Sequence, residues 1–348
     1  MAEVSKYLDI LEQAWAEHLA PREANAPTVI STFAGCGGSS LGYSMAGYRE
    51  LLAVEWDDNA VETFRLNFPD VPVYHGDIAK LSVEECLRLA GVAPGELDVL
   101  DGSPPCQGFS TAGKRQMDDP RNSLFREYVR LLRGLQPKVF VMENVSGMVK
   151  GKMKLVFAEI MRELKASGYI VSARLLNAMY FNVPQSRERL IFIGVREDLG
   201  IAPSHPKAEQ KPFTVRLAIE GCESVIDAPP WRKFNLDLWN RQKPGDNGID
   251  GKYFNHVRMD FDKPSPTVPK SAVFGGFVGL YHCTSPRSLN IGELKRIGSW
   301  PDGFSFTGSY EDALNRIGNS VPPLFMRSIA RHVRGQLLVS PSYAIEFA

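Results

Sequence analysis

The chain has 348 residues, with 40 basic and 40 acidic side chains and a hydrophobic fraction of 44%. This balance is typical of a globular protein with a substantial core, and it excludes a chain that coats nucleic acid with a uniformly basic surface. No apolar run reaches the roughly 18 residues of a membrane span, and the five cysteines form no CxxC pair. We therefore expect no membrane segment, no metal and a reducing, cytoplasmic setting.

The first half of the chain alternates apolar runs with amphipathic stretches. Residues 1–25 form an acidic, helix-periodic extension rather than a signal peptide. Strands are predicted at residues 28–34, 51–55, 71–75, 98–101 and 139–143, with helices at 39–45, 59–67, 83–90 and 123–135. Strand–helix alternation at this spacing predicts an α/β fold, in which helices cover both faces of a parallel sheet.

The second half is less regular. A helix is predicted at residues 154–167, and strands at 170–178 and 189–196 form an antiparallel pair at the sheet edge. Residues 203–281 are rich in Pro, Gly, Asn and Trp, and we interpret them as a smaller, loop-rich, partly β domain in which basic side chains alternate with aromatic ones. A solvated, loopy insertion is the alternative interpretation. Helical periodicity returns at residues 289–297 and 322–338.

Three predicted strands end in residues that suit an adenosine. Gly35 and Gly37 follow the first strand and would let the backbone approach a ligand, although any strand-to-helix turn can contain glycine. The second strand ends in Glu55 beside Trp56, and the third ends near Asp77. These acids can accept hydrogen bonds from a ribose or an adenine amino group, and the indole can cover an adenine face. The alternative is that both acids are helix N-caps.

The glycine loop matches neither GxxxxGK[ST] nor GxGxxG, which disfavours a nucleotide held by its phosphates and a dinucleotide. Among adenosine-containing cofactors, S-adenosylmethionine is therefore the favoured candidate.

The run "GSPPCQGFS" places a thiol after the fourth strand. Pro104 and Pro105 stiffen the chain directly before Cys106, so the sulfur is held at the edge of the sheet where ligands of such folds bind. Residues 107–122 are polar and glycine-spaced, which suits a mobile lid. The sequence thus predicts a positioned nucleophile rather than a buried structural cysteine.

A carboxylate and two guanidinium groups are predicted beside this thiol. Glu143 ends the fifth strand, and Arg187 and Arg189 are two residues apart, so they share one strand face. A thiolate that adds to carbon 6 of cytosine makes carbon 5 nucleophilic. A carboxylic acid can protonate ring N3 during that addition, and an arginine at O2 can stabilise the same movement of charge.

These motifs together resemble those of the C5-cytosine-specific DNA methyltransferases of the bacterial restriction-modification type. They stand in that family's order: "FAGCGG", "EW", "GDI", "SPPCQGFS", "ENV", "QSRER" and "GNSVPP". The resemblance covers the chain except for residues 1–25 and 203–281. It implies a Rossmann-like, S-adenosylmethionine-dependent methyltransferase sheet with a smaller, loop-rich target-recognition domain.

The resemblance also implies a role for each matching residue. Cys106 is expected to be the nucleophile, Glu143 the partner of cytosine N3 and N4, and Arg189 the partner of O2, with Arg187 supporting the site. The residues expected to line the cofactor pocket are Phe33, Gly35, Gly37, Glu55, Trp56, Asp77, Ile78, Pro104, Leu124 and Asn319.

The family pattern further implies how the chain is divided and what it binds. Residues 1–198 are expected to form the catalytic domain, 199–309 the target-recognition domain, and 310–348 a segment that returns to the catalytic domain. The expected substrate is double-stranded DNA with the cytosine flipped out of the helix, and the expected product of the cofactor is S-adenosylhomocysteine. A cognate restriction endonuclease and a monomeric state are also expected.

Two departures and two alternatives accompany this resemblance. Gly292 weakens an expected helix start, and Trp300 stands where the family has Phe. A tRNA cytosine-5 methyltransferase of the same fold is one alternative, although its motif has Phe-Thr after Pro-Pro-Cys. A non-catalytic DNA-binding homologue is the other, and it predicts a missing nucleophile or acid, whereas Cys106 and Glu143 are both present.

Overall fold

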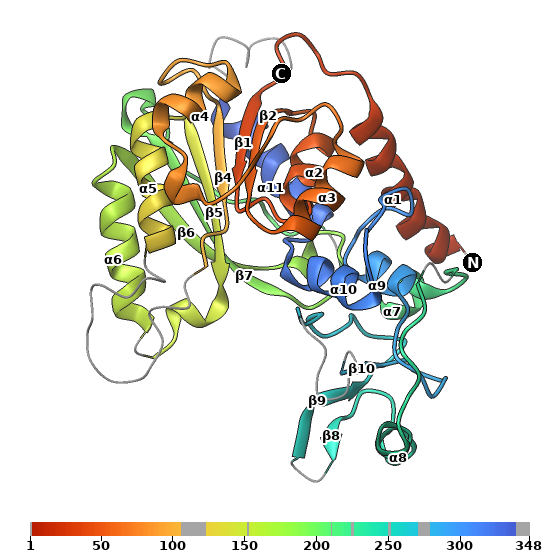
Figure 1. Cartoon of the computed structure of the whole chain (residues 1–348). Coiled ribbons are helices and arrows are strands. Elements are labelled where there is room, and N and C mark those ends of the chain that lie inside the picture. Colours follow the sequence, from red (N-terminus) through yellow and green to blue (C-terminus); the bar gives the residue numbers. More distant parts are fainter. Residues whose placement is uncertain are drawn as a thin grey trace.

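The computed structural model describes residues 2–105, 123–151, 153–209, 211–223, 226–249, 252–270 and 279–338. Its centre is a seven-stranded sheet in the order β3-β2-β1-β4-β5-β7-β6 (Figure 1). Strands β1 to β5 pair in parallel, whereas β7 runs antiparallel to both β5 and β6. The predicted α/β class and the antiparallel pair at the sheet edge are therefore confirmed.

The strands of this sheet are close to those predicted. They are β1 (Thr28–Thr32), β2 (Arg49–Glu55), β3 (Val73–His75), β4 (Val99–Gly102), β5 (Val139–Val145), β6 (Tyr169–Asn177) and β7 (Glu188–Arg196). Neighbouring residues alternate between the two faces: Val29 and Val139 belong to one core cluster, and Ile30 and Phe140 to the other. This period of two is what a sheet buried on both faces requires.

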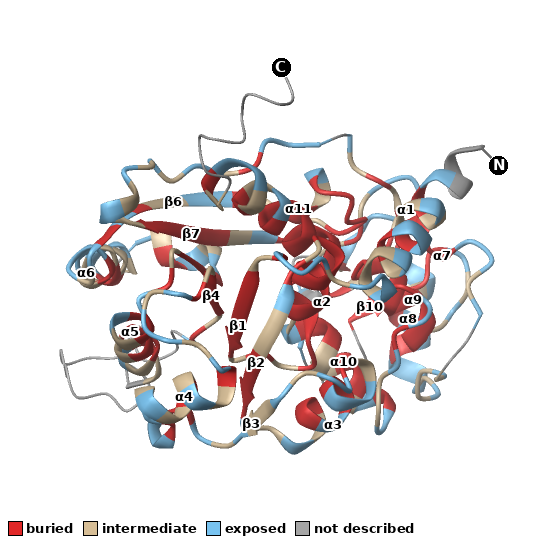
Figure 2. Cartoon of the chain, turned by 90° about the horizontal axis from the view of Figure 1, so that it is seen from above, coloured by how far each residue is buried: buried red, intermediate tan, exposed pale blue. Residues whose placement is uncertain are grey.

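Helices cover both faces of the sheet (Figure 2). One face carries α4 (Val83–Ala90), α5 (Ser123–Leu135) and α6 (Met153–Lys165). The other carries α1 (Ala2–Leu19), α2 (Gly38–Met45), α3 (Asp58–Asn67), α10 (Tyr310–Asn319) and α11 (Pro323–Val333). The predicted final helix, 322–338, thus ends at Val333 as an α-helix and continues as one π-helical stretch, Arg334–Leu338.

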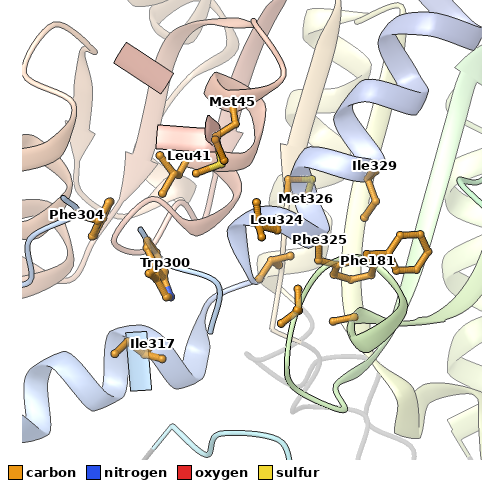
Figure 3. Close-up of a cluster of buried hydrophobic side chains, with 14 of the residues drawn as sticks. Leu41, Met45, Phe181, Trp300, Phe304, Ile317, Leu324, Phe325, Met326 and Ile329 are labelled. Carbon is orange, nitrogen blue, oxygen red and sulfur yellow. The ribbon is translucent and has the colours of Figure 1, made fainter. Parts of the chain in front are cut away.

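The last α-helix packs directly on the first helix after β1. Leu41 and Met45 of α2 lie against the cluster that includes Leu324 and Met326 of α11 (Figure 3). A Cβ atom added to Gly42 would lie 2.6 Å from the Met326 Cβ, so only glycine permits this close approach. Helix α11, near the end of the described chain, thus shares a core with a helix that follows the first strand.

The N-terminal helix α1 is part of the same core. Tyr7, Leu11 and Ala14 are buried in the cluster that contains α2 and α11. The Tyr7 hydroxyl donates to the carbonyl of Arg296 at 2.5 Å, and Glu17 pairs with Arg327 of α11 at 2.6 Å. Helix α1 therefore bonds to both α9 (Ile291–Ile297) and α11.

The region 203–281 contains a second sheet of three strands, β10-β9-β8 (Figure 1). Its strands are β8 (Asn247–Ile249), β9 (Lys252–Arg258) and β10 (Leu280–Tyr281), which agrees with the partly β interpretation. The sequence interpretation missed two helices here, α7 (Val215–Ile219) and α8 (Lys233–Arg241). The buried face of α8 includes the polar Asn235, whose amide donates to the Tyr281 hydroxyl, so the apolar period is broken.

Two further helices, α9 and α10, each begin at a capping box. Helix α9 begins at an Asn290–Glu293 capping box, and Gly292 lies in its first turn. A Cβ atom added to Gly292 would lie 2.4 Å from the Glu223 carbonyl oxygen, which explains why the residue is glycine. Helix α10 was missed as a separate element, although Ser309 and Asp312 form a capping box at its start.

The division into domains at residues 199 and 309 stays a prediction. Side chains of α7 and α9 belong to the same core cluster as α1 and α2.

Candidate active site

Among the described residues, predicted site residues stand at or near the carboxyl ends of β1, β2, β3, β4 and β5, and the strand order reverses between β1 and β4. Strands β1 and β4 are neighbours there, with Thr32 paired to Gly102. The glycine loop follows β1, and the Pro104 segment follows β4, so the two leave the sheet side by side. Ligands of open α/β folds bind in the crevice at such a reversal.

The glycine loop has an unusual backbone. Phe33, Gly35 and Gly37 have φ angles of 55°, 56° and 99°, in the left-handed region that disfavours residues with a side chain. An added Cβ at Gly37 would meet the Phe68 ring at 2.4 Å, whereas none of the described atoms lies within 4 Å of one at Gly35. The loop packs against Phe68 at Gly37 and has open space at Gly35. A ligand could therefore approach the backbone closely at Gly35.

The acid at the tip of β2 is oriented by backbone groups. The Gly35 N–H donates to Oε2 of Glu55 at 2.8 Å, and the N–H groups of Trp56 and Asp57 donate to Oε1 at 2.8 and 3.0 Å. Asp57, not Glu55, is the N-cap of α3, so the N-cap alternative is wrong for Glu55. The Trp56 side chain is 75% exposed, which leaves its ring face free to lie against a planar ligand.

At the end of β3, Asp77 agrees with the alternative that the acid is a helix N-cap. Asp77 is exposed, and its Oδ1 accepts the Ala79 N–H at 2.9 Å, so it does cap the short 3-10 turn Ile78–Lys80. Ile78 is buried in the core cluster under α4 and α5, and Leu124 packs at the edge of that same cluster. The cap leaves the second carboxylate oxygen of Asp77 available to a ligand.

The C-terminal segment forms another wall beside the glycine loop. Asn319 is the exposed last residue of α10, and the Oγ of the following residue, Ser320, lies 3.5 Å from the Sγ of Cys36. Burial raises the pKa of the Cys36 thiol to about 12, so Cys36 is a packing residue and not a second nucleophile. An added Cβ at Gly38 would lie 2.6 Å from the Val321 carbonyl oxygen, which explains the glycine there.

Cys106 and the predicted lid, residues 107–122, lie outside the described residues. The chain that leads to the thiol is described as far as Pro105. Pro104 is buried, and its carbonyl accepts the side-chain amide of Asn144 at 3.1 Å. The sequence interpretation did not single out Asn144, although it stands in the middle of the "ENV" motif. This bond ties the approach to Cys106 to the strand that carries Glu143.

Glu143 and Arg189 form an ion pair. The Arg189 Nε lies 2.6 Å from Glu143 Oε1, and the two side chains are 15% and 12% exposed. They belong to the neighbouring antiparallel strands β5 and β7, where Glu143 pairs with Ile191. A second guanidinium nitrogen of Arg189 donates to the Glu188 carbonyl at 2.8 Å, which holds the group in place. The predicted acid and its arginine are thus brought together.

Arg187 lies differently from Arg189. It is buried, and its guanidinium donates to the carbonyls of Val268 at 3.4 Å and Gly318 at 2.9 Å. Burial and the nearby charge of Arg189 lower its pKa to about 9. Arg187 therefore joins the start of β7 to the segment after β9 and to the last turn of α10, which carries Asn319; its supporting role stays a prediction.

The basic and aromatic side chains of the smaller region are partly used in its own packing. The Arg258 guanidinium stacks 3.8 Å from the centre of the Trp239 ring and donates to the carbonyls of Gln242 and Cys283. The Trp239 indole N–H donates to the His282 carbonyl at 3.0 Å. Arg232 and Lys233, at the start of α8, are exposed. The sequence pattern alone did not distinguish basic residues used in packing, such as Arg258, from exposed ones, such as Arg232 and Lys233.

None of the described helices combines the length and apolar character that crossing a membrane requires. No cluster of three or more His, Cys, Asp or Glu side chains that could bind a metal ion occurs in the described part of the chain.

Comparison with known proteins gives consistent matches over most of the chain. A family model described as C-5 cytosine-specific DNA methylase matches residues 27–228 and 227–334. The chain is 36% identical over 331 residues to the Type II methyltransferase M1.HphI of Haemophilus parahaemolyticus, which covers 88% of this chain and 86% of that protein. It is 32% identical to M.DdeI of Desulfomicrobium norvegicum, with 88% of each chain covered.

Solved structures share the fold. An Escherichia coli prophage protein, described as a DNA modification methyltransferase, superposes with a TM-score of 0.76 at 24% identity and covers 90% of this chain and 100% of its own. A Spodoptera frugiperda DNMT2 variant superposes with a TM-score of 0.66 at 19% identity and covers 89% of this chain and 99% of its own.

Proposed function

Because this chain belongs to the C-5 cytosine-specific DNA methylase family and is a DNA cytosine-5-methyltransferase of the Type II restriction-modification kind, we propose a role for each residue of its site. The observation that carries the proposal is the Glu143–Arg189 ion pair at 2.6 Å, beside the segment that leads to Cys106.

The proposed methyl donor is S-adenosylmethionine, which supplies an electrophilic methyl group. The open space before Gly35, the oriented Glu55 carboxylate and the exposed Trp56 ring suit an adenosine. Glu55 would accept from the ribose hydroxyls, and Asp77 from the adenine amino group. Phe33, Gly37, Ile78, Pro104, Leu124 and Asn319 would complete the pocket.

The proposed target is carbon 5 of a cytosine. The Cys106 thiolate would add to carbon 6, while Glu143 protonates N3 and Arg189 donates to O2. The bond between carbon 5 and the methyl group would form as the bond between that methyl group and the sulfonium sulfur breaks, which would leave S-adenosylhomocysteine. Loss of the carbon 5 proton to a base such as water, expulsion of the thiolate and return of the N3 proton to Glu143 would restore the aromatic ring. Arg187 would support this chemistry from its buried position and would not touch the base.

The proposed substrate is duplex DNA with the cytosine flipped out of the helix, since a thiol cannot reach carbon 6 within the base stack. Residues 199–309 would supply target recognition, with Arg232 and Lys233 near the DNA backbone. The Type II designation of the relatives supports a cognate restriction endonuclease as the biological partner. We also propose a cytoplasmic monomer.

Transfer of label from tritiated S-adenosylmethionine tests the substrate and the nucleophile together. Wild type should label duplex DNA, and Cys106→Ala should reduce the labelling to background. Labelling of tRNA in place of DNA would instead support the tRNA alternative. DNA binding without transfer by wild type would support the non-catalytic homologue.

A duplex with 5-fluorocytosine at the target tests the covalent step, because the fluorine cannot leave as a proton does. Wild type should form an adduct that survives denaturation, and Cys106→Ala should form none.

A further inference from the structure

An ion pair links the two walls of the proposed cofactor pocket. The guanidinium of Arg316, in α10, donates to both carboxylate oxygens of Asp57, at 2.9 and 3.3 Å. The two side chains are 14% and 37% exposed. Asp57 follows Trp56 directly, and Arg316 precedes Asn319 by less than one helical turn, so the pair joins the adenosine side of the pocket to its C-terminal side.

The Asp57 end of this pair is anchored to the acid of β2. Its backbone N–H donates to Oε1 of Glu55 at 3.0 Å, and its Oδ1 accepts the Ala60 N–H at 2.9 Å as the N-cap of α3. The backbone of Asp57 is thus bonded to Glu55, and its carboxylate is bonded to the first turn of α3.

The Arg316 end is anchored to the last turn of α10. The Arg316 carbonyl accepts from the Ser320 N–H at 3.2 Å and from the Ser320 Oγ at 2.7 Å. The same Oγ lies 3.5 Å from Cys36 in the glycine loop. Arg316, Asn319 and Ser320 thus belong to one hydrogen-bonded turn, and Ser320 of that turn meets the glycine loop.

From these contacts we propose that Arg316 is a positioning residue, which through Asp57 holds Glu55 and Asn319 at the separation that the nucleoside requires. This inference rests on the proposed function of the pocket. The Nε atom of Arg316 is buried and has no hydrogen-bond partner within the described structure, so the pair contributes little net stability. Its main effect is therefore expected on ligand binding.

Binding of S-adenosylhomocysteine, measured by calorimetry on the full chain, tests the inference. This probe carries no net charge, so salt acts mainly on the protein. Arg316→Gln should weaken binding about fivefold, the scale of a half-exposed ion pair. Asp57→Asn keeps the capping oxygen and should give a similar loss, and the double variant should lose no more than either single one. Arg316→Lys should restore part of the affinity.

The salt dependence and the kinetics separate positioning from general damage. Wild-type affinity should fall as salt is raised from low to high concentration, and that of Arg316→Gln should change less. The same variant should raise KM for S-adenosylmethionine about fivefold, on the same reasoning, and leave kcat nearly unchanged.

Asp302→Asn is the matched control, since Asp302 forms a similar two-contact pair with Arg296, at 3.0 and 2.7 Å, outside the pocket. It should bind the probe as wild type does. Wild-type-like affinity of Arg316→Gln, or an equal loss in Asp302→Asn, would overturn the inference. A wild-type protein that binds no probe would instead overturn the proposed function.

Discussion

The Nε atom of Arg189 lies 2.6 Å from Oε1 of Glu143, across two neighbouring antiparallel strands. Each side chain orients the other before any base is present, because both are largely buried and their backbones are held by the β5–β7 ladder. Under the proposed mechanism, a cytosine would therefore meet a carboxyl group and a guanidinium already in place. Such preorganisation is what makes electrostatic stabilisation effective.

Glu143→Gln should leave DNA binding intact and lower the rate of methyl transfer by about 10²–10⁴, the usual contribution of a general acid. The amide is similar in size to the carboxyl group but cannot supply the proton at N3. Single-turnover transfer measures the chemical step, and a gel-shift assay measures binding. A transfer rate within a few-fold of wild type would remove Glu143 from the proposed mechanism.

Arg187→Met and Arg189→Met should have opposite main effects. The first removes the donor to the Gly318 and Val268 carbonyls, so it should lower the free energy of unfolding by about 1–3 kcal/mol. The second should abolish methyl transfer with a smaller change in stability. Urea unfolding and transfer assays on both variants distinguish these outcomes, and equal losses of stability would contradict the assignment.

Gly318→Ala should be destabilising by about 1–3 kcal/mol, as in other overpacked sites. The added Cβ would lie 2.2 Å from the carbonyl oxygen of Pro269, which is backbone and cannot rotate away. Gly335→Ala is the control, because no described atom lies within 4 Å of its Cβ position. It should change the free energy of unfolding by less than about 0.5 kcal/mol.

Stability should fall as pH rises from about 4 towards about 8, because burial raises the pKa of Asp101 to about 8 from its ordinary value near 4. The Tyr43 hydroxyl, at 3.2 Å, and Ser39 donate to Asp101 and moderate this shift, whereas the negative charges of Glu50 and Glu143 increase it. The folded protein binds the proton more tightly than the unfolded chain, so the stability due to that proton is complete below the unfolded pKa. It is lost as pH passes the folded pKa.

Asp101→Asn should flatten this profile and raise Tm above pH 8 relative to wild type. Thermal unfolding from pH 5 to pH 9 measures both curves. Glu50 should leave a smaller residual slope in the variant, since burial raises its pKa to about 7. Parallel curves for the two proteins would contradict the assignment to Asp101.

Glu17→Gln should lower the free energy of unfolding by about 1–3 kcal/mol, because it leaves the buried Arg327 without its counter-charge. Glu23→Gln breaks the more exposed pair with Arg334 and should change stability by less than about 1 kcal/mol. Urea unfolding of both variants compares the contributions of the Glu17–Arg327 and Glu23–Arg334 pairs to stability. Equal effects would mean that the extension is not held by Glu17.

Elements with local end signals were predicted well. The bounds of α4 agree with the prediction because Ser82 caps its start and Gly91, with a φ of 67°, ends it. Helix α10 has a comparable signal in Ser309 and Asp312, which should have been recognised. Helix α8 has none: Arg232 stands at its N-cap without a side-chain bond, and its buried face holds Asn235. Asn235 bonds instead to Tyr281 of β10, 46 residues farther along the chain, and a local pattern does not contain such a contact.

The candidate site divides in the same way. Strand ends predicted that Glu55, Asp77 and Glu143 would lie along one edge, since parallel strands share their carboxyl ends. Arg189 reaches the same edge because it stands at the start of β7, which is antiparallel to β5. The contacts that position them join segments far apart in sequence, as when Asn144 holds the Pro104 carbonyl. The difference between Arg187 and Arg189 also depends on such partners, because the two side chains are alike until Gly318 and Val268 are placed.

The packing of α11 on α2 has a consequence for the order in which a nascent chain acquires its shape. Helix α2 is translated early, yet the atoms nearest to the Cβ positions of Gly38 and Gly42 belong to residues 320–327. A chain still on the ribosome must therefore keep the inner face of α2 uncovered until almost the whole protein has emerged. The part of the support that residues 320–327 give to α2 is then added only when synthesis is nearly complete, so a polypeptide that stops before residue 320 would contain every motif of the proposed site except "GNSVPP" and would lack this packing.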